Sequence, residues 1–336
     1  MKKVYSILCL FIATVAFVSC SDDDDTVTLS SLNNITDFKM SFEGLESDDI
    51  IYKTGNSITV SVPFGTTLDG LVATITVNKL AEIVPASGVE VDYVDGQATV
   101  FTVTAEDGTT KMYDVTISVR GEVGSGSQLA TYTVSDDIFG SYSITYSYSD
   151  ANFVTSMSLL EYGEEVKTML VYDNKNQVIE KKVEADKLST VYTYNDLGQI
   201  ITALKSADGS LTDTYTYVYD SETEYLISAT RVESNDKVSV VTYTIENGNV
   251  ISEDKTVEIH TATYDDKNNP FKGIYPKAYA AINIGIHGVN ENNPIDLNID
   301  DNGVTYVYND DDYPVSSTYT YMGFANVNKT FTYITE

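Results

Sequence analysis

The sequence predicts an all-β protein in which a β-sandwich is followed by a larger curved antiparallel sheet of repeated β-hairpins. Three observations predict this fold. Short runs of β-branched and aromatic residues alternate with polar ones, Asp-Gly and Asn-Asp turn signals separate the runs, and a tyrosine-containing unit recurs in the second half of the chain. Alternation at period two is the pattern of strands that bury one face, and a fixed spacing indicates repeated units.

The composition limits the number of domains and the class of partner. The chain has 336 residues, with 50 Asp and Glu against 20 Lys and Arg, and its formal net charge is −30. A chain this acidic repels phosphate, so no nucleic-acid partner is expected. Hydrophobic residues make up 42%, enough for a buried core. The length suits two domains of the usual ~100–200 residues.

Residues 1–19 have the pattern of a secretory signal peptide. Two lysines precede an apolar run at 7–18, and a helix of this length, ~18 Å, is too short for a ~30 Å hydrocarbon core. The run ends at Val18-Ser19-Cys20, which resembles a bacterial lipobox. That resemblance implies cleavage before Cys20, a diacylglycerol on its sulfur, and attachment to a membrane through this lipid.

Residues 20–34 are predicted to form a lipidated acidic tether. The start of this segment resembles the acidic export signal that follows the lipid cysteine in surface lipoproteins of the Bacteroidetes, and the residues that carry the resemblance are Ser21, Asp22, Asp23, Asp24 and Asp25. The resemblance implies a lipid-anchored outer-membrane protein that faces the cell exterior. A charge run is also an ordinary solvated tether, and the anchor would then face the periplasm.

Residues 35–120 are predicted to form an immunoglobulin-like β-sandwich. Alternating runs at 57–62, 98–103 and 113–119 are separated by Asp-Gly turns. Six or seven strands in about 85 residues suit such a sandwich. The stretch 103–115 resembles the penultimate hairpin of sandwich domains in Bacteroidetes surface lipoproteins, which implies a spacer or a binding stalk and not a catalyst.

Residues 121–129 are rich in glycine and serine and are predicted to be a linker. Residues 130–336 are predicted to form the tyrosine-rich antiparallel β domain. Intervals of 24, 22, 25 and 26 residues separate the successive members of a series of repeat positions, which are Tyr148, Tyr172, Tyr194, Tyr219 and Ile245. One strand pair with its turns needs about that many residues, so each unit is predicted to be one hairpin.

Tyrosines share one face of the predicted strands in this second domain. Tyr215, Tyr217 and Tyr219 alternate with Thr and Val, so one face of that strand is aromatic. Two interpretations are open. The rings pack across strands in a core, with each hydroxyl at the rim, or they form an exposed platform that stacks on the sugar rings of a ligand. An exposed row favours the platform, and a buried row favours the scaffold.

The second domain resembles two groups of proteins. The stretches 264–274 and 306–314 resemble an uncharacterised Bacteroidetes lipoprotein family of porin-like antiparallel β architecture, which has no established activity. The unit at 192–200 resembles the tyrosine-aspartate (YD) repeats of secreted bacterial shells, a second choice because those repeats are more regular. The face opposite the tyrosines carries Ser and Thr, so a membrane-spanning sheet is not expected and the tyrosine side is expected to be enclosed.

The least strand-like region is 271–293. Within it, the stretch 276–286 is rich in alanine and is predicted to form one short helix that covers an open end of the sheet.

No catalytic residue is predicted. His260 and His287 lie in strand-like runs and are interpreted as solvent-facing or rim residues. The sequence contains no Gly-x-Ser-x-Gly, no His-Glu-x-x-His and no cysteine pair for zinc. With 50 acidic residues, some pair of carboxylates will always suit glycoside hydrolysis, so this pattern carries no information.

Calcium is the one metal for which the sequence offers weak candidates, because oxygen-rich loops suit a hard cation. An EF-hand-like start at Asp296 fails at the positions of the glycine and of the bidentate glutamate. Irregular calcium sites at hairpin tips are a second hypothesis, with candidate ligands at Asp300, Asp301, Asp310, Asp311 and Asp312. The alternative is ordinary Asx-turn chemistry. No other cofactor is expected.

Two functions from different classes follow from these observations. The first is a non-enzymatic cell-surface lipoprotein that captures glycan or a protein partner through its β domains. The second is a structural or adhesive cell-surface component without a small ligand. A glycoside hydrolase or a calcium-dependent enzyme is a weaker third interpretation.

Overall fold

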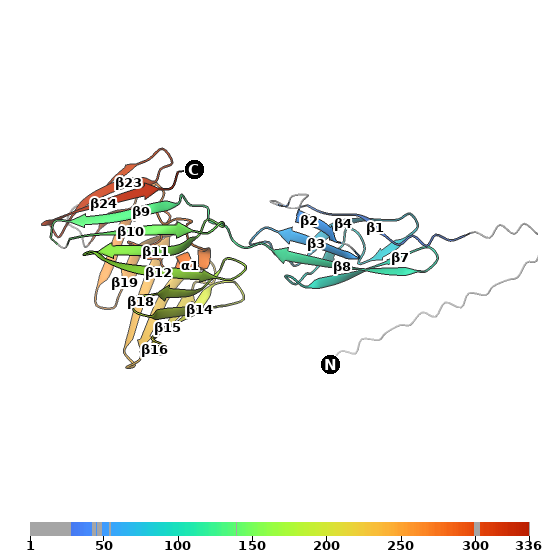
Figure 1. The fold of residues 1–336 in the computed structure, drawn as a ribbon, viewed down its shortest axis with the longest axis horizontal. Helices are drawn as coiled ribbons and strands as arrows, with labels where there is room; N and C mark the ends of the chain where they lie inside the picture. The colour runs from blue at the N-terminus through green and yellow to red at the C-terminus, as the bar shows by residue number, and fades with distance from the viewer. Residues whose placement is uncertain are drawn as a thin grey trace, which may run out of the picture. The chain divides into compact units, whose positions relative to one another are not determined.

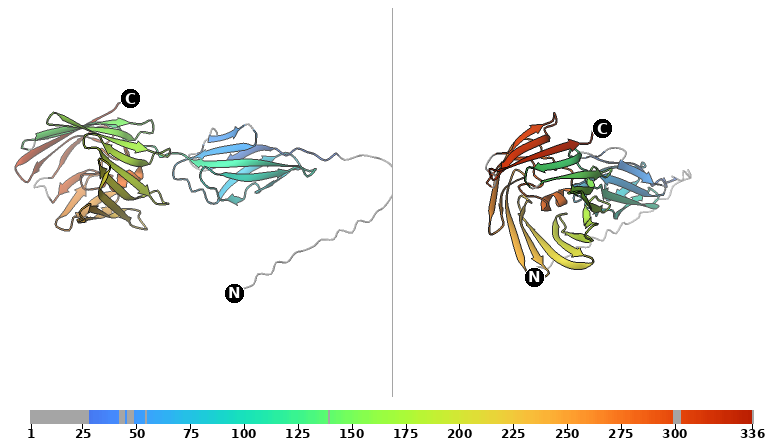
Figure 2. Two further views of the ribbon diagram at one scale, coloured as in Figure 1. Left: turned by 60° about the horizontal axis from the view of Figure 1, so that its bottom comes forward. Right: turned by 60° about the vertical axis from the view of Figure 1, so that its left-hand side comes forward.

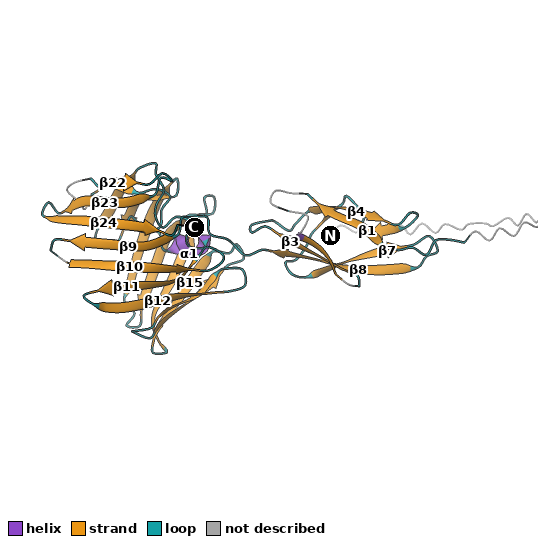
Figure 3. Cartoon of the chain, turned by 45° about the horizontal axis from the view of Figure 1, so that its top comes forward, coloured by secondary structure: helices purple, strands orange, loops and turns teal. Residues whose placement is uncertain are grey.

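The computed structural model describes residues 28–41, 45, 49–53, 55–138, 140–298 and 303–335. The chain folds as two compact units (Figure 1). The first extends to residue 118 without 62–66, and the second comprises 62–66 and the chain from 119 onward. Strands dominate both units (Figure 3), so the predicted all-β class is confirmed.

The first unit contains two antiparallel sheets. The described strands of the three-stranded sheet are β1 (Ile35–Met40), β4 (Leu71–Val77) and β6 (Glu90–Val91), in that order. Those of the five-stranded sheet are β2 (Ile50–Lys53), β3 (Ser57–Val62), β8 (Thr110–Val119), β7 (Ala98–Thr104) and β5 (Glu82–Val84). Phe38 of β1 meets Phe101 of β7 edge-to-face with ring centroids 6.4 Å apart, so the two sheets share one core.

The second unit is one large sheet of sixteen described strands, each antiparallel to its neighbour, which confirms the predicted curved sheet of repeated hairpins. In spatial order the strands are β21 (Pro294–Leu297), β20 (Ile259–Tyr264), β19 (Asn249–Asp254), β18 (Val238–Glu246), β17 (Leu226–Glu233), β16 (Ser210–Tyr219), β15 (Ile200–Ala207), β14 (Leu188–Tyr194), β13 (Val178–Val183), β12 (Glu164–Tyr172), β11 (Val154–Glu161), β10 (Gly140–Tyr148), β9 (Leu129–Asp136), β24 (Ala325–Tyr333), β23 (Pro314–Tyr321) and β22 (Thr305–Tyr308).

The sheet is nearly closed. Its two edge strands, β21 and β22, follow one another in the chain, and the N–H of Val304 donates to the carbonyl of Ile295 at 2.7 Å where they approach. Pairing of β24 with β9 joins the last strand of the chain to the first strand of the unit. Figure 2 shows the strands curving around a short helix. The concave face is therefore the interior of the unit.

A row of tyrosine hydroxyls joins neighbouring strands at one end of the sheet. Each hydroxyl donates to the carbonyl of the first or second residue of a strand, and the pairs are Tyr148 to Leu129, Tyr172 to Val154, Tyr194 to Val178, Tyr219 to Ile200, Tyr264 to Val250, Tyr306 to Pro294 and Tyr333 to Pro314. We call these seven residues the tyrosine rim. Six of them end their strands.

The register explains why each rim tyrosine links two hairpins. Tyr194 pairs through its backbone with Ile200, the start of the next hairpin, after a β-bulge at Thr193. Its hydroxyl reaches Val178 at the start of its own hairpin. Val178 and Ile200 are fully buried, so their carbonyls have no access to water and need a donor. The 24-, 22- and 25-residue intervals of the sequence are the spacing of this rim.

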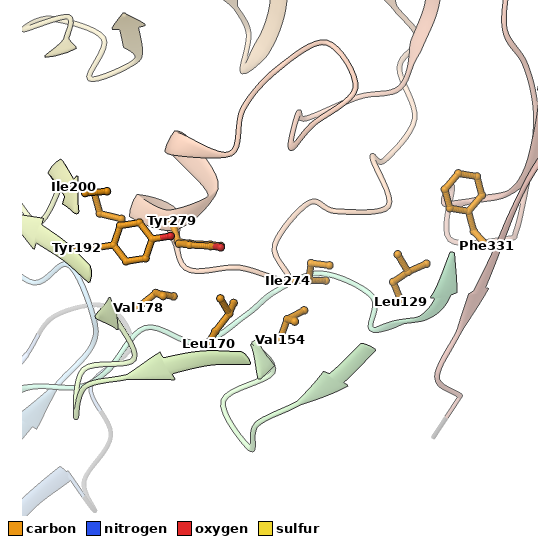
Figure 4. Packing of buried hydrophobic residues seen from close by; sticks show 10 residues of the cluster. Leu129, Val154, Leu170, Val178, Tyr192, Ile200, Ile274, Tyr279 and Phe331 are labelled. Atoms are coloured by element: carbon orange, nitrogen blue, oxygen red, sulfur yellow. The ribbon is translucent and has the colours of Figure 1, made fainter. Parts of the chain in front are cut away.

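The helix α1 (Lys277–Ile282) confirms the short helix predicted at 276–286 and packs against the concave face. Tyr279 lies edge-to-face on Tyr192 of β14 with centroids 5.6 Å apart, and Ile274 before the helix is fully buried. Figure 4 shows Tyr279 beside Tyr192 and Ile200, and Ile274 beside Val154 and Leu129. The segment around α1 thus supplies core side chains that the sheet alone lacks.

The segment predicted to be a linker is hydrogen bonded to the second unit along its length. The N–H of Gly124 donates to Ala151 at 2.8 Å, and those of Ser125 and Gly126 donate to Gly273 at 3.1 and 3.2 Å. A Cβ at Gly126 would lie 1.9 Å from the carbonyl oxygen of Lys272. The glycines here allow close packing of two backbones, whereas the sequence pattern alone indicates flexibility.

Among the described residues, no helix is long and apolar enough to cross a membrane.

Gly126→Ala should destabilise the second unit by about 1–3 kcal/mol, because the added methyl group forces the segment away from Lys272. Gly285→Ala is the matched control, since a Cβ there meets only Glu253 Oε2 at 3.7 Å. Urea unfolding of both variants measures the difference. Equal midpoints for the two variants would show that the segment is not packed as described.

Tyr219→Phe should lower the free energy of unfolding by about 1–3 kcal/mol, because it removes the donor from the carbonyl of buried Ile200 and leaves the ring in place. Tyr321→Phe is the control, because the Tyr321 hydroxyl makes no hydrogen bond within the described part of the chain. Denaturant unfolding reports both. A cost below that of the control would contradict the role of the rim.

Candidate functional site

Two cavities lie beside α1 in the second unit. The larger, of about 380 Å³, is lined by residues of α1, by the segment before β9 and by the turns around Leu226 and Gly248, and we call it the rim cavity. The smaller, of about 250 Å³, lies between the concave face of the sheet and the end of α1, and we call it the inner cavity.

The inner cavity is built from side chains that alternation turns toward the interior. They come from β13 to β16 and from the end of α1, and are Lys181, Val183, Leu188, Thr190, Tyr192, Lys205, Tyr215, Tyr217, Ile282 and Asn283. Lys181 pairs with Leu170 and Thr190 on adjacent strands, and both of those are buried, which fixes Lys181 on the concave face.

The predicted row of three tyrosines divides between two places. Tyr215 and Tyr217 are half-buried and line the inner cavity. Tyr219 belongs to the tyrosine rim, with its hydroxyl 2.8 Å from the carbonyl oxygen of Ile200. The row is thus neither an exposed platform nor a closed core. Ligand stacking by Tyr215 and Tyr217 stays a prediction, and Tyr219 occupies a position that supports the fold.

The tyrosines of the inner cavity are neutral hydrogen-bonding groups at physiological pH. Burial raises the pKa of Tyr192, Tyr215 and Tyr217, and burial also raises the pKa of Tyr279, which contacts Tyr192, to about 12. Their hydroxyls can donate and accept hydrogen bonds, and their ring faces are apolar. The cavity therefore offers both kinds of contact to a polyhydroxylated ring.

A compact ion cluster lies beside the inner cavity. Asp213 of β16 is only 4% exposed and accepts from Arg231 Nε at 2.7 Å, with Lys205 Nζ 3.8 Å away. Although burial alone would raise it, the hydrogen bonds from Arg231 and Thr212 lower the pKa of Asp213. No isolated sequence signal marks this cluster, because its members lie on three different strands.

The rim cavity sits where the tyrosine rim is interrupted. Ile245 stands at the repeat position that carries tyrosine in the preceding hairpins, and Ile245 and Leu226 both line the cavity. Its charged groups pair with one another: Lys277 lies 3.3 Å from Glu224, and Lys272 lies 2.7 Å from Glu291. The Glu122 carboxylate, whose pKa burial raises, accepts from the backbone N–H of Lys277.

The histidines line neither cavity. His260 is on β20, with Nε2 2.9 Å from Glu258 Oε1. His287 follows α1 in a loop rather than in the strand-like run that the sequence suggests, and its side chain is exposed.

The acidic candidates divide between described and undescribed residues. At the tip between β22 and β23, Asn309 Oδ1 accepts from the N–H groups of Asp311 and Tyr313, and Asp312 pairs with Lys267 at 2.9 Å. Asx-turn chemistry accounts for that tip. Within the described residues no group of three or more His, Cys, Asp or Glu could hold a metal ion. The remaining predicted site residues lie outside the part of the chain that the structure describes, and they are Asp300, Asp301, Cys20, Ser21, Asp22, Asp23, Asp24 and Asp25.

Comparison with known proteins bears on the first unit. Residues 35–117 match the family described as "SGBP, N-terminal", the N-terminal domain of surface glycan-binding proteins of the Bacteroidetes. This match agrees with the predicted resemblance to sandwich domains of Bacteroidetes surface proteins. No curated protein matches the chain.

Two solved structures from Bacteroides are similar to the chain. A porin-like protein from Bacteroides uniformis is 19% identical over 62% of this chain and 99% of its own, with a TM-score of 0.43. A DUF4623 family protein from Bacteroides eggerthii is 10% identical over 89% of this chain and 99% of its own, with a TM-score of 0.23. At these TM-scores the likeness carries no inference about function.

Proposed function

We propose that this protein captures glycan at the bacterial cell surface without chemically altering it, and that the inner cavity is a sugar-binding site. The observation that carries the proposal is the match of residues 35–117 to the N-terminal domain of surface glycan-binding proteins. The second unit then supplies the binding surface, because it contains a cavity with aromatic faces and convergent polar groups.

The lining of the inner cavity suits a sugar ring. Tyr215 and Tyr217 offer apolar ring faces, while Thr190 and Asn283 add hydrogen-bonding groups to the tyrosine hydroxyls. Its volume of about 250 Å³ is slightly below the ~300–1,000 Å³ of typical small-molecule sites, which suits one or two sugar rings.

The same lining argues for binding and against hydrolysis. Glycoside hydrolysis uses two carboxyl groups on either side of the scissile bond. No Asp or Glu lines the inner cavity, and the glutamates of the rim cavity are engaged by lysine side chains or by a backbone N–H. This placement supports the proposed non-enzymatic role.

The proposed location is the outer surface of the outer membrane, with Cys20 lipidated and the acidic residues after it as the export signal. The SGBP match supports a cell-surface role, and the lipobox-like residues before Cys20 supply the means of attachment. A protein partner at the surface is compatible with this arrangement.

The full-length protein should bind at least one oligosaccharide on a glycan array, and Tyr215→Ala should weaken that binding by about tenfold or more, because it removes a ring face from the inner cavity. Val218→Ala is the matched control, since Val218 lies on the outer face of the same strand. Isothermal titration calorimetry measures both affinities. If no glycan binds, and pull-down from cell envelopes yields no partner either, the structural role replaces this proposal.

Cys20→Ala should move the protein from the membrane fraction to the soluble fraction, because it removes the sulfur that carries the lipid. Fractionation of cells that express each form, followed by immunoblotting, measures the distribution. Protease treatment of intact cells tests display, since a surface-exposed protein is cleaved. Retention of the variant in the membrane fraction would contradict the anchor.

A further inference from the structure

The inner cavity has an unexpected charge for so acidic a chain. The protein carries 50 acidic and 20 basic residues, yet the two formally charged residues that line this cavity are both lysines, Lys181 and Lys205. Both lie on the concave face, at positions two strands apart in the sheet. An acidic protein would repel an anionic ligand from most of its surface, whereas this lining places two basic side chains at the cavity.

The two lysines differ in whether a carboxylate pairs with their positive charge. Lys205 Nζ lies 3.8 Å from Asp213, which also binds Arg231, so Lys205 belongs to the ion cluster. Lys181 forms no ion pair and no hydrogen bond within the described part of the chain. The next residue, Lys182, faces the opposite side of the sheet and pairs with Glu180 at 3.0 Å.

An unpaired ammonium group inside a folded unit is unfavourable. Burial lowers the pKa of Lys181, and the charge of Lys205 lowers it further, which means that the charged form is disfavoured in this position. Its strand neighbours on this face, Leu170 and Thr190, provide no compensating charge. A carboxylate or sulfate in the cavity would supply the missing charge and would form a charge-assisted hydrogen bond with the ammonium.

We propose that the inner cavity recognises an acidic sugar, a glycan residue bearing a carboxylate or sulfate group, and that Lys181 is the residue that binds this group. This inference rests on the proposed function, because it names the class of glycan that the cavity selects. Tyr215 and Tyr217 contact the ring, and Thr190 and Asn283 contact its hydroxyls. Lys205, already paired with Asp213, adds a positive field without direct coordination.

The test compares matched pairs of oligosaccharides that differ only in charge. Calorimetric titration of the full-length protein uses oligogalacturonate against the same oligomer with its carboxyl groups reduced, and chondroitin sulfate oligosaccharides against their desulfated forms. The acidic member of at least one pair should bind about tenfold or more tightly than its neutral partner at low salt. This preference should weaken as salt is added. The two pairs distinguish the carboxylate from the sulfate.

Lys181→Gln should remove the preference for the acidic member, and Lys182→Gln, which deletes the same charge from the outer face, should leave it unchanged. Lys181→Arg should retain most of it, because the positive charge is kept. Urea unfolding provides the second readout: Lys181→Gln should unfold at the same or a higher denaturant concentration, since it removes an uncompensated charge. A purely structural Lys181 would give the opposite shift.

The outcomes separate the two proposals. If neutral and acidic oligosaccharides bind equally and Tyr215→Ala weakens both, the glycan-binding function stands and the recognition of an acidic group is wrong. Equal losses in Lys181→Gln and Lys182→Gln would also overturn it. If none of these oligosaccharides binds although another glycan binds on the array, the glycan-binding function stands and the acidic-sugar proposal is wrong.

Discussion

The hydrogen bond from a tyrosine hydroxyl to a buried carbonyl is the interaction on which the large sheet depends. Each sheet strand that starts a hairpin begins with a residue shielded from water, and Val154, Val178 and Ile200 are fully buried. A carbonyl in such a place costs free energy unless it has a donor. The tyrosine of the following strand supplies it and, through its own backbone, pairs with the next hairpin. The same residue therefore satisfies a polar group, fills the concave core and sets the spacing of the repeats.

The interruption of the tyrosine rim at Ile245 shows how the repeat makes room for other features. An isoleucine has no hydroxyl to reach Leu226, and the rim cavity lies at this position. The segment around α1 lies near this position and packs against the tyrosines of the concave face. The inner cavity lies at the end of α1, where the helix does not cover the concave face. The inner cavity, the proposed binding site, thus exists because one short helix does not fill the concave side of the sheet.

The hairpins and their aromatic face could be predicted from the sequence because period-two alternation and the spacing of repeats are local signals. The helix at Lys277–Ile282 was also predictable from its alanines. The role of each tyrosine could not be predicted, because Tyr215 and Tyr219 follow the same sequence pattern. They differ in their tertiary contacts: Tyr215 lines the inner cavity and Tyr219 donates to the carbonyl of Ile200. Residues 121–129 show the same limit of local signals. Glycine permits flexibility and close backbone packing alike, and the neighbours at Lys272 and Gly273 decide between them. The position of Lys181 in the inner cavity could not be predicted from the net charge of −30, because the net charge sums over both faces of the sheet.

Pairing of β24 with β9 has a consequence for how the protein reaches its final form. All other pairings in the described sheet join strands that are consecutive in the chain. Hairpins can therefore form in order as the chain emerges during synthesis or export. The free edge of β9, however, has no partner until the last strand arrives about 190 residues later. During that interval its unpaired N–H and C=O groups are a template for strands of other chains. Loss of β24 would leave a folded array of hairpins with an open edge at β9, prone to self-association rather than to unfolding.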